Sequence, residues 1–136
     1  MSLRNTWHAT ISSQGRHERK TDLGVIKLHK EVISSIANLA AQEVEGVHGL
    51  QPNMLSSLAE LFGRKSYDRG VKVELGEADA KITLFVIVKY GVNIPDVASA
   101  LQENVKQAIE KMTGLSNVEV NVEVAGIAPA KTVTSE

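Results

Sequence analysis

The sequence predicts an α+β fold in which helices cover one face of a small, mainly antiparallel sheet. Apolar residues recur with helical spacing in three segments and alternate with polar residues in others. The predicted order of these segments along the chain is β-α-α-β-β-α-β. Because each helix has one apolar stripe and the sheet has one clear apolar face, we expect a two-layer sandwich.

The first strand and the first helix are predicted directly after a polar N-terminal stretch. Residues 24–28 are short and rich in β-branched side chains, which favours a strand. Apolar residues between positions 32 and 44 then follow one helical stripe, and we expect this helix to end near Gly46. His29 precedes the helix. Neutral imidazole is a poorer N-cap than serine, so the start of the helix is expected to fray.

A second, shorter helix and a β-hairpin are predicted in the middle of the chain. Apolar residues at helical spacing mark residues 54–62, and the charged stretch at 64–70 is typical of a surface loop. Residues 71–75 alternate between apolar and polar, and residues 81–90 are apolar at nearly every position. Two such runs across a short turn predict an antiparallel hairpin.

The last helix has the strongest end signals in the sequence. Asn93 is a favourable N-cap, Pro95 falls in the first turn, and Gly114 is a favourable terminator. The valines of residues 118–124 alternate with Glu and Asn, which predicts a final strand with one buried face.

Charge and hydropathy divide the chain into an arm, a domain and a tail. Residues 1–23 carry four Lys or Arg against two Asp or Glu, a net charge of +2, which leaves 11 against 14, or −3, for the remainder. Neither terminus has a sustained apolar period. We therefore expect a flexible arm at 1–23, one folded domain at 24–127 and a flexible tail at 128–136.

Composition excludes several classes of protein. A chain of 136 residues has room for one core, and the absence of cysteine excludes disulfide scaffolds and thiolate metal sites. The net charge of −1 offers nucleic acid no long-range attraction. The longest apolar run is far shorter than a membrane span, and the N-terminus lacks a secretory signal, so we expect a cytoplasmic protein with no direct span.

Catalysis is not expected from the motifs. The four histidines form no ligand pair on one helix face, and no nucleophile elbow, Walker loop or dinucleotide fingerprint occurs. The acidic residues fall mostly on predicted helix exteriors and outward strand positions. The sequence therefore predicts a protein that is not an enzyme and uses no metal or other cofactor.

RNA binding is the alternative function. Gly46-Val47-His48-Gly49 is a G-x-x-G sequence between two predicted helices, the placement that KH domains use to clamp backbone phosphates. With 10 glycines in the chain, the pattern is expected by chance about 0.7 times. Glu43 and Glu45 precede it and its central pair has no Lys or Arg, so nucleic acid is a disfavoured partner.

Two surface sites are candidates for protein or membrane contacts. Phe85, Ile87 and Lys89 share the predicted outer face of the long strand, where two large apolar groups suit self-association or a partner protein. The other interpretation is that the arm or the tail covers this face. The cations Arg64, Lys65 and Arg69 suit an anionic surface or an acidic partner, or simply the end of the second helix.

Seven short stretches of the sequence after Gly24 carry a joint signal by their order and spacing. They are Glu45-Gly46-Val47, Leu61-Phe62-Gly63-Arg64-Lys65, Gly70-Val71-Lys72-Val73, Val88-Lys89-Tyr90-Gly91-Val92-Asn93-Ile94-Pro95, Asn104-Val105, Met112-Thr113-Gly114-Leu115 and Val120-Asn121-Val122. No single stretch is diagnostic, but together they are a specific signal. Through them the chain resembles the bacterial alkaline-shock-protein family from Gly24 onward, over about three-quarters of its length.

The resemblance implies a non-catalytic protein of the envelope stress response. It implies a scaffold or adaptor at the cytoplasmic side of the membrane, held there by a membrane-anchored partner and able to self-associate. The arm before Gly24 is not covered by the resemblance, and the family tends to carry a small hydroxyl residue where this chain has His29.

Overall fold

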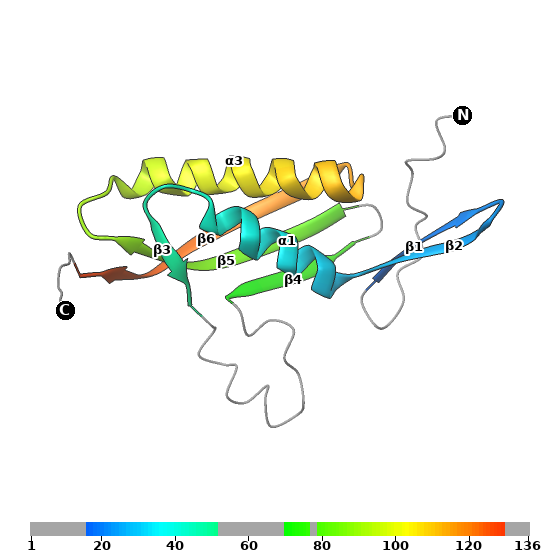
Figure 1. The fold of residues 1–136 in the computed structure, drawn as a ribbon, viewed down its shortest axis with the longest axis horizontal. Helices are drawn as coiled ribbons and strands as arrows, with labels where there is room; N and C mark the ends of the chain where they lie inside the picture. Colours follow the sequence, from blue (N-terminus) through cyan, green and yellow to red (C-terminus); the bar gives the residue numbers. More distant parts are fainter. Residues whose placement is uncertain (1–15, 52–69, 77–78, 130–136) are drawn as a thin grey trace, which may run out of the picture.

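The computed structural model describes residues 16–51, 70–76 and 79–129. In this part of the chain, strands and helices form the predicted α+β fold (Figure 1). The elements are β1 (Arg16–Thr21), β2 (Gly24–His29), α1 (Lys30–Gln42), β3 (Val47–Leu50), β4 (Val71–Leu75), β5 (Asp79–Lys89), α3 (Ile94–Thr113) and β6 (Asn117–Ala128).

Strand β5 is the centre of the main sheet. β3 and β4 pair with it in antiparallel fashion along one edge, and β6 pairs with it in parallel along the other edge. The hairpin of β4 and β5 is confirmed. The parallel pair follows from α3, which leaves the end of β5 and returns the chain to the same end of the sheet from which β5 started.

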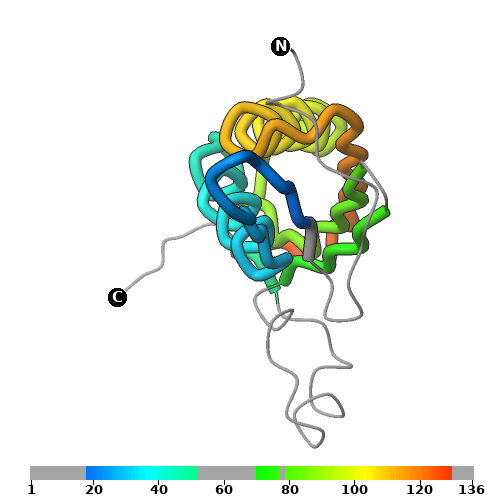
Figure 2. Tube along the Cα trace, turned by 90° about the vertical axis from the view of Figure 1, so that its right-hand side faces the viewer, coloured from blue at the N-terminus to red at the C-terminus, as the bar shows by residue number. Residues whose placement is uncertain are grey.

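The two helices cover one face of this sheet. α1 contacts β3 and β4, while α3 contacts β6 and α1. Seen along the long axis, the two helices lie together toward the upper left, and the strands of the main sheet lie toward the right and below (Figure 2). The predicted two-layer arrangement is therefore confirmed.

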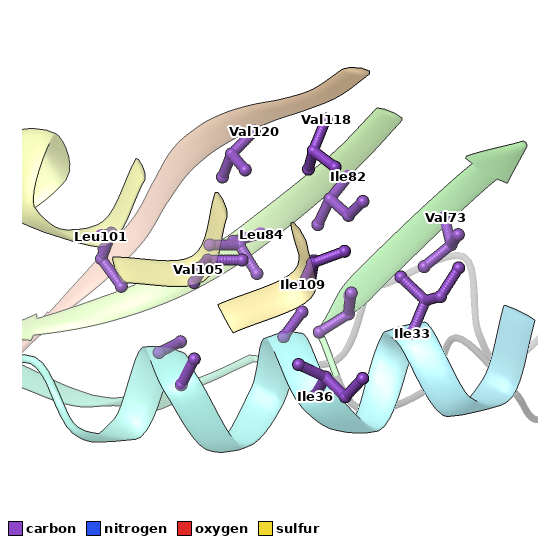
Figure 3. Packing of buried hydrophobic residues seen from close by; sticks show 14 of the residues in the cluster. Ile33, Ile36, Val73, Ile82, Leu84, Leu101, Val105, Ile109, Val118 and Val120 are labelled. Carbon is purple, nitrogen blue, oxygen red and sulfur yellow. The ribbon is translucent and has the colours of Figure 1, made fainter. Parts of the chain in front are cut away.

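The core lies between these two layers. On β5 every second side chain is buried, from Ala80 to Val88, because successive side chains of a strand point to opposite faces. Figure 3 shows how helix and strand residues interdigitate there; its labelled members are Ile33, Ile36, Val73, Ile82, Leu84, Leu101, Val105, Ile109, Val118 and Val120.

The ends of the two helices follow the sequence signals. The Asn93 side chain accepts a hydrogen bond from the backbone N–H of Asp96 at 3.0 Å, which is N-capping. Gly114 ends α3 with φ of +77°, a conformation that glycine adopts without steric cost. His29 precedes α1 in an extended conformation and its side chain makes no capping hydrogen bond, in line with its poor capping ability.

Three strand assignments differ from the sequence prediction. Strand β1 occupies the end of the predicted arm and pairs only with β2, so these strands form a separate hairpin that projects from the body (Figure 1). Strand β3 replaces the expected turn after α1, and β6 extends to Ala128, beyond the expected end of the last strand. Each of these strands exists through pairing with a partner, which short-range patterns do not reveal. The predicted helix at 54–62 lies outside the described residues.

Candidate functional site: the outer sheet face

Phe85, Ile87 and Lys89 lie on the face of β5 that points away from the helices. Their neighbours Leu84, Val86 and Val88 are buried on the core side, whereas Phe85 and Ile87 are half-buried and Lys89 is exposed. The alternation predicted this register, and the structure has it. Hereafter, the outer face means this surface of β3 to β6.

Both backbone polar groups of Phe85 bond to neighbours at the junction of β3 and β4. Its N–H donates to the carbonyl of Gly70 at 2.9 Å, and its carbonyl accepts from the N–H of Gln51 at 2.7 Å. Gln51 and Gly70 are the residues that flank positions 52–69. The chain therefore leaves and rejoins the described structure beside Phe85, at the middle of the outer face.

Glycine flanks Ile87 on both neighbouring strands. The register places Gly49 of β3 on one side and Gly126 of β6 on the other. A Cβ at Gly126 would lie 3.9 Å from both the Ile87 side chain and the Gln51 amide oxygen, which is ordinary contact. Because neither glycine has a side chain, Ile87 is not shielded laterally by its strand neighbours.

Charged side chains surround this apolar centre. Lys72 and Glu74 of β4 form an exposed ion pair at 3.4 Å. Lys81 lies between Glu74 and Glu119 in the sheet register, and Glu123 lies beside Phe85. An apolar centre with a polar rim is typical of a protein contact surface. The cations Arg64, Lys65 and Arg69 lie outside the described residues, so their part in this surface stays a prediction.

The structure removes the geometric basis of the RNA-binding alternative. Val47–Leu50 form strand β3, the Val47 side chain is buried, and the carbonyl of Gly46 accepts a hydrogen bond from the N–H of Lys89 at 2.9 Å. The G-x-x-G sequence is thus an edge of the sheet and not the phosphate-clamping loop that the alternative requires.

Polar clusters elsewhere in the described residues offer little chemistry. A surface hollow of about 470 Å³ between the end of α1 and the middle of α3 is lined by Glu43, Glu45 and Glu103. No set of three or more His, Asp or Glu side chains in the described ranges is arranged to hold a metal ion. Within the same ranges, no helix has the length and apolarity needed to cross a membrane.

Sequence reasoning missed the polar residues by which α3 is attached to its neighbours. Asn104 donates to the carbonyl of Ala40 in the last turn of α1 at 2.8 Å. Gln102 donates to the carbonyl of Val120 at 3.0 Å, and Lys106 donates to that of Val118 at 3.1 Å. In the sequence these side chains resemble ordinary exposed helix positions, because nothing local marks a distant backbone acceptor.

These features define a class: a two-layer α+β domain whose sheet, within the described residues, has helices on one face and a mixed apolar and charged surface on the other. The family is shown by comparison with known proteins. The chain belongs to the alkaline shock protein 23 family, which is described as having a cell envelope-related function and whose model matches residues 18–129. The match confirms the resemblance and begins earlier than Gly24, within β1.

Relatives from two bacteria agree with this assignment. YqhY of Bacillus subtilis is 40% identical over 107 residues, which are 79% of this chain and 79% of YqhY. YloU of the same organism is 31% identical over 112 residues, 81% of this chain and 93% of YloU. A stress response regulator gls24 homolog of Streptococcus pyogenes is 29% identical over 105 residues, 76% of this chain and 59% of the regulator.

Among solved structures, MamM-CTD has a similar arrangement at low similarity. It is 16% identical, with a TM-score of 0.44, over 71% of this chain and 99% of that structure. Nothing about function follows from this likeness.

Proposed function

We propose that this protein is a non-catalytic scaffold or adaptor of the envelope stress response, which acts at the cytoplasmic side of the membrane by contacts with other proteins. In this proposal the outer face binds a membrane-anchored protein partner. The observation that carries the proposal is the position of Phe85 and Ile87. They lie at the centre of a sheet face that no helix of the described residues covers.

The backbone around this surface is well fixed. The β5 strand pairs along both edges, and the Phe85 backbone is bonded to Gln51 and Gly70. A surface on paired strands loses little conformational entropy when it binds, which favours a docking role. The membership in an envelope-related family and the gls24-type relatives support the cellular setting.

The energetics favour action by several copies together. Complete burial of a large apolar side chain contributes about 1.5 to 3 kcal/mol, and Phe85 and Ile87 are already half-buried. The two side chains together therefore contribute about 1.5 to 3 kcal/mol, whereas even a millimolar complex requires about 4 kcal/mol. A single outer face binds weakly, and an assembly gains affinity because its faces act on one membrane simultaneously.

The test replaces the apolar centre and follows the protein in cells. The variant with Phe85→Glu and Ile87→Lys is expected to lose most of its recovery in the membrane fraction, and to lose crosslinks to membrane proteins. Its circular dichroism spectrum and melting temperature should stay close to those of the parent protein, because both side chains point away from the core.

A matched control introduces a charge at another exposed apolar position. Met112 is exposed on α3, on the opposite layer of the molecule, so Met112→Glu should leave membrane recovery unchanged. Equal membrane recovery of the parent protein and the outer-face variant would contradict the proposal. So would an equal loss in both variants.

A further inference from the structure

The structure points to a second contact surface, the free edge of β6. Within the described residues only one edge of β6 pairs, with β5, from Asn117 to Ala128 with a register shift at Ala125. An unpaired strand edge presents a row of backbone N–H and C=O groups that can bind another strand. The two halves of this edge differ in how the rest of the molecule covers them.

The first half of the edge is covered by α3. Gln102 and Lys106 donate to the carbonyls of Val120 and Val118. Since backbone groups alternate in direction along a strand, the carbonyls of Val118 and Val120 that α3 reaches are those directed away from β5. These side chains therefore block strand addition at this half, and the valine side chains themselves are buried.

The second half of the edge lacks this cover. By the same alternation Val122 and Val124 direct their backbone groups outward, and no side chain of the described ranges donates to their carbonyls. The apolar side chains also emerge here: Val124 is 39% exposed and Ile127 is 56% exposed. An open edge and partly exposed apolar side chains thus coincide at Val122 and Val124, and Ile127 follows after the pairing with β5 shifts register between Val124 and Gly126. We call the segment from Val122 to Ile127 the acceptor edge.

The hairpin of β1 and β2 has the complementary features. Val25 and Ile26 of β2 are 49% and 47% exposed, and within the described residues β2 pairs with β1 alone. Ile26 and Lys27 alternate as the β6 residues do, so an added β2 would place Ile26 beside the partly exposed valines and Lys27 beside Glu123.

Charge favours this pairing over pairing of two like edges. Residues 16–29 hold four Lys or Arg against two acids, a net charge of +2. Every charged residue of β6 is a glutamate. Two β6 edges would therefore bring glutamates together, whereas a hairpin brings lysine to glutamate.

The hairpin cannot dock on the acceptor edge of its own copy. β2 continues directly into α1, which packs on the β3 and β4 side of the sheet, and β6 is the opposite edge. The hairpin also projects away from the body along its long axis, while the acceptor edge lies toward the other end (Figure 1). The occupant must therefore come from another molecule.

We propose that the hairpin of one copy adds as a strand to the acceptor edge of a second copy. The contact is heterologous, because each copy offers one hairpin and one acceptor edge, so successive copies join in an open-ended chain. This inference rests on the proposed function, because the assembly would bring together the several outer faces that bind the membrane-anchored partner. The assembly contact itself uses a surface separate from Phe85 and Ile87.

The test uses two full-length variants with one defective surface each. Ile26→Asp disables the hairpin and Val124→Asp disables the acceptor edge; both positions are substantially exposed, so the fold should persist by circular dichroism. Light-scattering mass is measured from about 1 to 100 μM, the range of moderate protein affinities. The parent protein should grow beyond a dimer, and each variant alone should stay monomeric.

Mixing the two variants gives the decisive result. The Val124→Asp copy still has an intact hairpin, and the Ile26→Asp copy still has an intact acceptor edge. One copy of each can therefore join, and the mixture should form dimers and nothing larger. A mixture that stays monomeric, or variants that assemble like the parent protein, would overturn the proposal. Met112→Asp is the control at an exposed apolar position of α3 and should assemble normally.

A charge exchange separates the contact from damage to folding. Lys27→Glu and Glu123→Lys should each weaken assembly, and a chain that carries both should recover it, because the opposite charges face each other again. Failure of recovery in the double variant would count against the lysine–glutamate alignment and overturn the proposed register. The Phe85→Glu, Ile87→Lys variant should assemble normally, so loss of membrane recovery with normal assembly distinguishes the two proposals.

Discussion

Individual glycines decide whether the strands around Phe85 can meet. Gly70 has φ of +84°, and a Cβ at this position would lie 2.8 Å from the backbone carbonyl oxygen of Gln51. The neighbouring atom is backbone and cannot move aside easily. Gly91 has a similar φ of +97° but has no atom within 4 Å of such a Cβ. The two positions thus share the backbone strain and differ in the steric contact.

We predict that Gly70→Ala is more destabilising than Gly91→Ala. The strained backbone alone should cost about 1 kcal/mol at Gly91, and the contact with Gln51 should raise the cost at Gly70 to about 2 to 3 kcal/mol. Urea unfolding of both variants measures this difference. Equal losses of unfolding free energy in the two variants would show that the backbone around Gly70 relaxes without penalty.

At the scale of elements, the two helices begin with unequal caps. Asn93 caps α3 through its side chain, whereas His29 leaves the first N–H groups of α1 without a side-chain acceptor from its own position. The cause is chemical: a short amide oxygen reaches the N–H two or three residues ahead, and neutral imidazole is a poor N-cap. Since α1 also carries the projecting hairpin, its first turn is where the hairpin meets the body.

Improving the cap of α1 should stabilise the whole domain. His29→Ser is expected to raise the free energy of unfolding by about 1 kcal/mol, and Asn93→Ala should lower it by about the same amount. For a chain of this size the corresponding change in melting temperature is about 4 °C in either direction. Calorimetry checks both; a neutral His29→Ser would mean that other groups already satisfy the start of α1.

At the scale of the whole molecule, the charge distribution disfavours nucleic acid. The net charge is −1, the G-x-x-G sequence is built into the sheet edge, and Glu43 and Glu45 stand directly before it. A phosphate approaching this region therefore meets negative charge.

We predict that a labelled single-stranded RNA shows no saturable binding below about 10 μM at moderate salt. Fluorescence anisotropy is a direct measurement, with a KH domain as positive control. Saturable binding that is lost when Gly46 and Gly49 are both replaced by Asp would restore the RNA-binding hypothesis.

The sequence by itself determined the properties that depend on near neighbours. Helix α3 was predictable with both of its ends, because Asn93 and Gly114 act on groups within a few residues. The side of β5 on which Phe85 and Ile87 lie was predictable as well, since alternation alone sets it. The family resemblance rested on the same local signals of caps, turns and alternation.

Only the tertiary structure decided which strands meet. β1 is too polar and β3 too short to be recognised alone, and each becomes a strand because a partner strand lies beside it. The parallel pairing of β5 with β6, and the half of the β6 edge that α3 leaves uncovered, likewise depend on residues far apart in the chain. Hydrogen bonds between distant backbone groups leave no local mark, so the contact surfaces built from them emerge only in three dimensions.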